Sequence, residues 1–206
     1  MTFYKRHLPH WQPDEAEFFV TFRLAGSLPA VAIKRLKKYN EELHKGEEKK
    51  FKSNYSSKIF QKYENLIDGA EKGPTWLKEK KITQIVQESL HFYDNKEYEL
   101  YAYCIMPNHV HVVFKLIGRD KPTHVYPVTN VIGKIKSYSA QESNKILNRK
   151  GAFWQAESYD RVIRDEKELE NTIAYTLNNP VKAGLAKRWK DWPYTYCKPE
   201  FLISFA

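Results

Sequence analysis

The chain has 206 residues, of which 42% are hydrophobic, so it is long enough for one compact domain with a packed core. With 34 Lys and Arg against 25 Asp and Glu, its formal charge is +9, which favours a polyanionic partner such as nucleic acid. Two cysteines without a CxxC pair indicate neither a zinc knuckle nor a disulfide framework, and no stretch approaches the ~18 apolar residues of a membrane span. We therefore expect a cytoplasmic protein without membrane association.

The first part of the chain predicts one strand followed by helices. Residues Glu17 to Leu24 are aromatic and β-branched, which is typical of a strand, and Gly26 and Pro29 end it. The stretch from Ala30 to about Gly69 is rich in Lys and Glu, with apolar residues at helical intervals. We interpret residues 30–75 as a helical insertion in a single domain that covers residues 1–206.

The middle of the chain predicts a helix and a β-hairpin. The helix runs from Trp76 to about Tyr93, and strands follow at 98–105 and 109–116. Pro107 cannot donate a hydrogen bond in a central strand, so Pro107 and Asn108 are expected at the turn of the hairpin.

The last third of the chain predicts two helices around a short strand. Val128 to about Leu147 forms a helix that turns Tyr138 inward, and an edge strand follows at Tyr159 to Ile163. The final helix spans Glu166 to Asn178, where Pro180 stops it. This order of elements predicts an α+β fold in which helices flank an antiparallel sheet.

Two histidines on the second strand of the hairpin are candidate metal ligands. His109 and His111 are two residues apart, so their side chains point to the same face of the sheet. Each neutral imidazole offers a nitrogen lone pair to a divalent cation, and a third ligand is expected. We expect the pair to be accessible because it follows a turn. His124 is a further candidate in a polar loop, and an incidental His-x-His pair is the alternative.

A tyrosine and an asparagine share a face of the final helix. Tyr175 and Asn179 are four residues apart and could present a phenol nucleophile beside an amide metal ligand. The alternative is an ordinary aromatic residue of an amphipathic helix. Asn179 could instead mark the helix end that Pro180 imposes, and Asn178 is its rival as ligand.

Four blocks of the sequence can be compared with known families: Cys104 to His111; Phe153-Trp154-Gln155 with Tyr159-Asp160-Arg161 and Ile163-Arg164-Asp165; Tyr175 with Asn179 to Gly184; and Arg6 to His10 with Phe19 to Pro29. Together they resemble the REP-associated tyrosine transposases, a group of the HUH single-tyrosine transposases. They occur in the family's order and cover most of the chain.

The resemblance implies both a fold and a chemistry. It implies a ferredoxin-like antiparallel sheet with flanking helices, and Mg²⁺ or Mn²⁺ held by His109 and His111. It places Tyr175 at the nucleophile position and Asn179 at the third-ligand position, with Tyr138 as a rival nucleophile. The implied protein is a bacterial, nucleoid-associated endonuclease and transposase. It would cut and rejoin single-stranded, hairpin-forming DNA through a 5′-phosphotyrosine, acting as a monomer or homodimer.

DNA binding would require cations on phosphates and aromatic rings on bases. The candidate cations flank the helix after the hairpin and the catalytic helix; they are Lys134, Lys136, Arg161, Arg164 and Lys182. Three other functions remain open at this point. The chain could be a catalytically inactive or domesticated DNA-binding protein, a metal-dependent phosphoester hydrolase that uses water, or an RNA-binding domain with Tyr101 and Tyr103 on a central strand.

Overall fold

A five-stranded antiparallel sheet, of order β6-β3-β5-β4-β7, forms the centre of the molecule. The computed structural model describes residues 2–5, 9–13, 15–29, 31–32, 34, 38, 62–63, 66–67, 73–118 and 127–202. The strands of the sheet are β3 (Glu17–Arg23), β4 (Tyr98–Ile105), β5 (His109–Leu116), β6 (Tyr159–Ile163) and β7 (Thr195–Cys197). A separate antiparallel hairpin joins β1 (Thr2–Lys5) and β2 (Pro9–Gln12).

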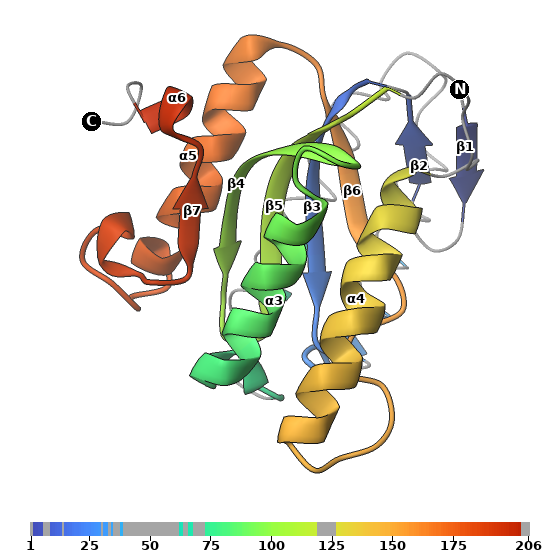
Figure 1. Cartoon of the computed structure of the whole chain (residues 1–206), viewed down its shortest axis with the longest axis vertical. Coiled ribbons are helices and arrows are strands. Elements are labelled where there is room, and N and C mark those ends of the chain that lie inside the picture. Colours follow the sequence, from blue (N-terminus) through green and yellow to red (C-terminus); the bar gives the residue numbers. More distant parts are fainter. Residues whose placement is uncertain are drawn as a thin grey trace.

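Helices cover both faces of the five-stranded sheet. Figure 1 shows α3 and α4 side by side across one face, with α5 set apart from them. The helical elements are η1 (Trp76–Lys78), α3 (Lys80–Tyr93), α4 (Pro127–Ile146), α5 (Glu166–Lys182), η2 (Trp189–Asp191) and α6 (Pro199–Leu202). The predicted α+β class, an antiparallel sheet with flanking helices, is confirmed. No helix within the described ranges is long and apolar enough to cross a membrane.

The alternation of side chains along β5 separates two hydrophobic cores. Val110, Val112 and Phe114 belong to the larger core, which the apolar residues of α3 and α4 complete. Val113 points the other way, into a smaller core with Ile173 and Leu177 of α5. The side chains of His109 and His111 point to the same side of β5 as Val113, so they lie on the α5 face of the sheet.

The predicted hairpin and edge strand are confirmed. β4 and β5 have the expected bounds, and the amide of Met106 donates to the carbonyl of His109 at 2.8 Å to close the turn. Among the described strands, β6 pairs with β3 and forms one edge of the sheet.

Two predictions about the helices are wrong. Helix α5 does not stop before Pro180 but continues to Lys182, and Gly184, at φ 68°, follows its end. Pro180 has no N–H to donate, so the helix passes it with the loss of one backbone hydrogen bond. Tyr138 does not face inward: its side chain is 51% exposed, because the buried stripe of α4 passes instead through Ile135 and Ser139.

The predicted insertion lies largely outside the described residues. Residues 31, 32, 34, 38, 62, 63, 66 and 67 of this stretch are helical. Tyr63 and Ile67 are buried and join Leu28 and Tyr159 in a third small cluster. This part of the stretch therefore packs at the end of the sheet where β3 finishes.

Candidate active site

The candidate site lies between β3, β5 and α5. β3 and β5 pair antiparallel with Thr21 opposite His111 and Arg23 opposite His109. Because opposite residues of paired strands point to the same face, Phe19, Thr21 and Arg23 share the face of the two histidines. The Phe19 ring stacks on His111, with centroids 5.5 Å apart.

Hydrogen bonds fix both imidazoles. The Nε2 atoms of His109 and His111 are 2.8 Å apart. On the outer side of each ring, His109 Nδ1 lies 2.6 Å from Asn108 Oδ1, and His111 Nδ1 lies 2.9 Å from Thr21 Oγ1. An amide oxygen can only accept, so His109 donates from Nδ1 and keeps its Nε2 lone pair. Nε2 of each ring therefore faces the same point.

The histidine pair is buried, contrary to the expectation that a position after a turn is accessible. His109 is 1% exposed and His111 is fully buried, because Phe19 and helix α5 cover the end of the strand. Burial lowers the pKa of His109 to about 3, with the Lys182 cation as a second cause. Burial also lowers the pKa of His111 well below its usual value, followed by the effects of His109 and Lys182. Both rings are neutral at physiological pH and can act as ligands.

Helix α5 brings Tyr175 to the histidines. Asp165 caps the helix by accepting from the amide of Glu168 at 2.8 Å, and Glu166 favours its N-terminus. The buried stripe of the helix is Leu169, Thr172, Ile173, Thr176, Leu177, Asn179 and Pro180. Tyr175 is half-buried beside this stripe, and its ring meets those of His111 and Phe19 edge to face, with centroids 5.8 and 6.1 Å away.

Asn179 and Lys182 follow Tyr175 on the same face of α5, at helical spacings of four and seven residues. Asn179 is 1% exposed. Its Nδ2 donates to the Tyr175 carbonyl at 3.3 Å, whereas its Oδ1 is buried without a hydrogen-bond partner. Its rival Asn178 is exposed and donates back to the Ala174 carbonyl. Of the two asparagines, Asn179 is thus the buried one, with an oxygen that makes no hydrogen bond.

These three side chains fit a divalent cation. Two Nε2 atoms of neutral imidazoles converge, and a buried amide oxygen on the facing helix has no hydrogen bond. Among the described residues, no group of three or more His, Cys, Asp and Glu side chains could hold a metal ion. A cation where the two Nε2 atoms meet would have His109 and His111 as ligands, and the oxygen of Asn179 is the candidate third ligand. His124 lies outside the described residues.

Three of the five candidate DNA-binding cations lie around α5. The Lys182 ammonium is 5.7 Å from the centre of the Tyr175 ring. Arg161 forms an ion pair with Glu168 and also donates to Thr172, and Arg164 lies 3.7 Å from the same carboxylate. A cavity of about 410 Å³ lies here; its lining is Arg161, Asp165, Lys167, Glu168, Asn171, Thr172 and Tyr175. The cavity lies along α5, and the Tyr175 side chain forms part of its wall.

Helix α4 holds the other two cations and the rival tyrosine, on the opposite face of the sheet. Lys134 pairs with Glu97 at 2.7 Å. Lys136 donates to the carbonyls of Gln155 and Ala156 and to the Ser158 hydroxyl. The structure does not bring these lysines or Tyr138 to the histidines, because α4 packs on the other core.

Sequence reasoning missed the residues that hold the histidines. Phe19 and Thr21 lie on β3, about 90 positions before their partner His111. Alternation along residues 17–24 puts Thr21 and Arg23 on one face, but that face is known to be the histidine face only once β3 is paired with β5. The sequence predicted Asn108 at the turn of the hairpin but not its hydrogen bond with His109.

Comparisons with known proteins identify the family of this chain. A sequence family described as "Transposase IS200 like" matches residues 77–179. A Haemophilus influenzae protein, provisionally assigned as a REP-associated tyrosine transposase, is 32% identical over 48% of this chain and 58% of its own. The REP-associated tyrosine transposase of Escherichia coli is 23% identical over 49% and 55% of the respective chains. The match thus spans somewhat more than half of each curated relative.

A solved structure supports the fold independently. It is described as a REP-associated tyrosine transposase bound to a REP hairpin, and it aligns over 95% of this chain and 82% of its own. The TM-score is 0.53 at 17% sequence identity. At that identity the likeness concerns the arrangement of helices and strands.

Proposed function

The chain belongs to the IS200-like transposase family, and from this premise we propose that it is a metal-dependent single-stranded DNA endonuclease and transposase. It would cleave and rejoin hairpin-forming DNA through a 5′-phosphotyrosine at Tyr175. The proposal rests chiefly on the contact of the Tyr175 ring with His111, whose Nε2 faces that of His109. A nucleophile beside a convergent pair of neutral imidazoles suits phosphoryl transfer better than nucleic-acid binding alone.

The chemistry exchanges one phosphodiester for another. The Tyr175 oxygen bonds to the scissile phosphorus as the bond from phosphorus to the 3′ oxygen breaks. The phenol loses its proton, and the departing 3′ oxygen gains one and becomes a free hydroxyl. Attack of a 3′ hydroxyl on the phosphotyrosine reverses these steps, so the strand is rejoined without ATP.

A divalent cation, Mg²⁺ or Mn²⁺, held by His109, His111 and Asn179 would polarise a non-bridging phosphate oxygen and lessen charge repulsion to attack. The residues of the chain supply the rest. Phe19 and Thr21 hold the His111 ring in one orientation. The Lys182 ammonium lies beside the Tyr175 ring and would stabilise the phenolate that forms during attack.

The cavity beside α5 could hold a single DNA strand next to the Tyr175 phenol. Lys167 and Asn171 line it together with Arg161 and Tyr175. The solved structure with this fold is of a transposase bound to a REP hairpin. We therefore take a hairpin-forming repeat as the substrate class of this chain. A bacterial protein that processes chromosomal repeats would act in the cytoplasm, at the nucleoid.

Covalent capture tests the proposal. Labelled hairpin DNA from the repeats that flank the gene would be incubated with the protein and Mn²⁺ and then run on a denaturing gel. We expect a protein–DNA band that a chelator abolishes and that Tyr175→Phe lacks while still binding the DNA. Tyr138→Phe is the matched control, because that tyrosine lies on the opposite face, and it should give the wild-type band. A band that persists in Tyr175→Phe would refute the assignment.

A negative capture result would also be informative. Tight, metal-independent binding of the same hairpin without any covalent band would support the domesticated DNA-binding protein instead. Multiple turnover of a small phosphodiester by Tyr175→Phe would support the hydrolase that uses water.

A further inference from the structure

Arg23 lies at the end of β3, beside the histidine pair. It is the third member of the stripe in which Phe19 stacks on His111 and Thr21 bonds to it. Its register partner on β5 is His109. The chemistry proposed above gives this residue no role, although it is a permanent cation on the face where DNA would be cut.

The guanidinium of Arg23 is buried and only partly satisfied. The residue is 4% exposed. Nη1 donates to the Ser27 hydroxyl at 3.1 Å and more weakly to the Leu24 carbonyl at 3.5 Å. Nε is buried without a hydrogen-bond partner, and Nη2 has none within the described part of the chain. No carboxylate there forms an ion pair with Arg23.

The free donors share one edge of the guanidinium. Nε–H and one N–H of Nη2 point in the same direction, and this edge binds two oxygens of a phosphate or carboxylate at once. The opposite edge is the one that Ser27 and Leu24 occupy. The local structure therefore holds the side chain by one nitrogen and leaves its bidentate edge unused.

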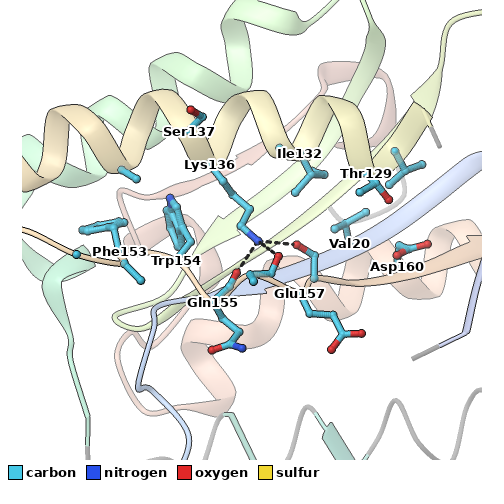
Figure 2. A pocket seen from close by; sticks show the side chains of 17 residues that line it. Val20, Thr129, Ile132, Lys136, Ser137, Phe153, Trp154, Gln155, Glu157 and Asp160 are labelled. Atoms are coloured by element: carbon cyan, nitrogen blue, oxygen red, sulfur yellow. Dashed lines mark hydrogen bonds between the residues drawn. The ribbon is translucent and has the colours of Figure 1, made fainter. Parts of the chain in front are cut away.

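A second cation, the half-buried Lys136 of α4, is near enough to Arg23 for the two charges to influence each other. Figure 2 shows the Lys136 ammonium hydrogen bonded to the segment that carries Gln155 and Glu157, at the edge of a cavity of about 380 Å³. Burial lowers the pKa of Lys136 to about 8, and the Arg23 charge is the next cause. Lys136 uses its three N–H groups within the protein, so of these two cations Arg23 is the one able to bind a further group.

A buried guanidinium without a counter-ion is costly, because desolvation of the charge is not offset by attraction to an anion. The second cation nearby increases the cost. The hydrogen bonds to Ser27 and Leu24 satisfy one nitrogen of the guanidinium. They neither neutralise its charge nor use the donors of its free edge. An anion that arrives with the substrate would complete the site.

We propose that the free edge of Arg23 binds a phosphodiester of the DNA strand, next to the phosphate that Tyr175 attacks. The inference rests on the proposed function for the identity of the anion. Because Arg23 is in register with His109, this contact would fix how far the strand extends past the histidines. Arg23 is thus a substrate-binding residue, distinct from the nucleophile and from the ligand set.

The test is the salt dependence of hairpin binding, measured with a chelator present so that no cleavage occurs. Each phosphate contact contributes about one to the slope of log K against log salt concentration. We expect Arg23→Gln to weaken binding by on the order of tenfold to a hundredfold and to lower the slope by about one. Arg188→Gln is the matched control: it removes the same charge from an exposed arginine paired with Asp191, and it should change the slope little.

Inorganic phosphate provides a readout that does not depend on DNA. At equal ionic strength, phosphate should raise the Tm of the wild-type protein more than chloride does, and Arg23→Gln should lose that difference. Arg23→Lys keeps the charge and should retain the salt slope while it binds the hairpin less tightly. If Arg23→Gln fails to fold, Arg23→Lys and the wild-type response to phosphate still decide the matter.

The outcomes separate the two proposals. An unchanged affinity and slope in folded Arg23→Gln would overturn the phosphate contact, even if the wild-type protein cuts DNA through Tyr175. A wild-type Tm that responds equally to phosphate and chloride would also overturn it. If the phosphate response depends on Arg23 but no hairpin is bound, the anion site stands and the proposed function fails.

Discussion

The ring of His111 meets the ring of Tyr175 edge to face, with centroids 5.8 Å apart, although the two residues lie on a strand and a helix 64 positions apart in sequence. His111 thereby links the phenol to His109, whose ring centroid is 4.5 Å from its own. Any substitution at His111 should consequently disturb both the ligand pair and the wall beside the nucleophile.

We predict that His111→Ala abolishes covalent capture and the response of the protein to metal. Mn²⁺ should raise the Tm of the wild-type protein, because an ion that binds only the folded state stabilises it. The variant should show no such rise. His91→Ala is the matched control, since His91 is exposed on α3 and contacts Tyr103 on the other face. A full Mn²⁺ response in His111→Ala would rule out the proposed ligand set.

Thr21→Val should weaken metal binding without changing any ligand. The hydroxyl is a hydrogen-bond partner of His111 Nδ1, and valine keeps the shape but cannot make this hydrogen bond. We expect a loss of metal affinity of about 10–100-fold and of stability of about 1–3 kcal/mol. Mn²⁺ titration and urea unfolding measure the two effects.

Thr176→Val provides the control for Thr21→Val. Thr176 is also fully buried, but its hydroxyl only donates to the Thr172 carbonyl of the same helix. Its replacement should lower the free energy of unfolding by less than about 1 kcal/mol, because the Thr172 carbonyl already belongs to the hydrogen-bonded backbone of the helix. Equal metal affinity in both variants would show that the Thr21 hydroxyl does not orient the imidazole.

The amide oxygen of Asn179 yields a third prediction. Asn179→Ala should weaken Mn²⁺ binding by about 1.4 kcal/mol or more, a factor of ten. Asn179→Asp keeps an oxygen at the same place and should restore binding. Asn178→Ala removes the neighbouring exposed amide and should bind Mn²⁺ as the wild type does. If Asn179→Ala binds as tightly as the wild-type protein, the third ligand must come from elsewhere.

Local sequence patterns predicted the parts of the fold that short-range physics controls. Pro107 had to lie at a turn because it lacks an N–H, and period-two alternation placed His109 and His111 opposite Val110. Helix spacing placed Tyr175 and Asn179 on one face, as the structure has them. These features depend on residues within about one turn or one hairpin of each other.

Non-local packing decided what could not be predicted. The burial of His109 depends on Phe19 and α5, which come together only when β3 pairs with β5. β7 has three residues, too few for a recognisable alternation, and exists because β4 offers it an edge. The burial of Arg23 and its place opposite His109 likewise depend on the pairing of β3 with β5.

The Lys136 ammonium should make the stability of the protein depend on pH above neutrality. Its pKa is about 8 in the folded protein, lowered first by burial and then by Arg23, with Glu157 acting in the opposite direction. It is about 10.4 in an unfolded chain. Between these values the unfolded chain binds more protons, so stability rises with pH. Below pH 8, the folded protein therefore carries the full loss of stability caused by the lowered pKa of Lys136.

We therefore predict that the wild-type protein gains about 2 kcal/mol relative to Lys136→Met between pH 7.5 and pH 9.5. The difference between the two proteins isolates Lys136, because every other titrating group is common to both. Lys134→Met is the control for the loss of one lysine from the same helix, since Lys134 pairs with Glu97 and not with the segment that Lys136 contacts. Urea unfolding at the two pH values measures the effect. Parallel pH dependence in wild type and Lys136→Met would mean that this ammonium keeps an ordinary proton affinity, and that its environment is less positive than the proximity of Arg23 implies.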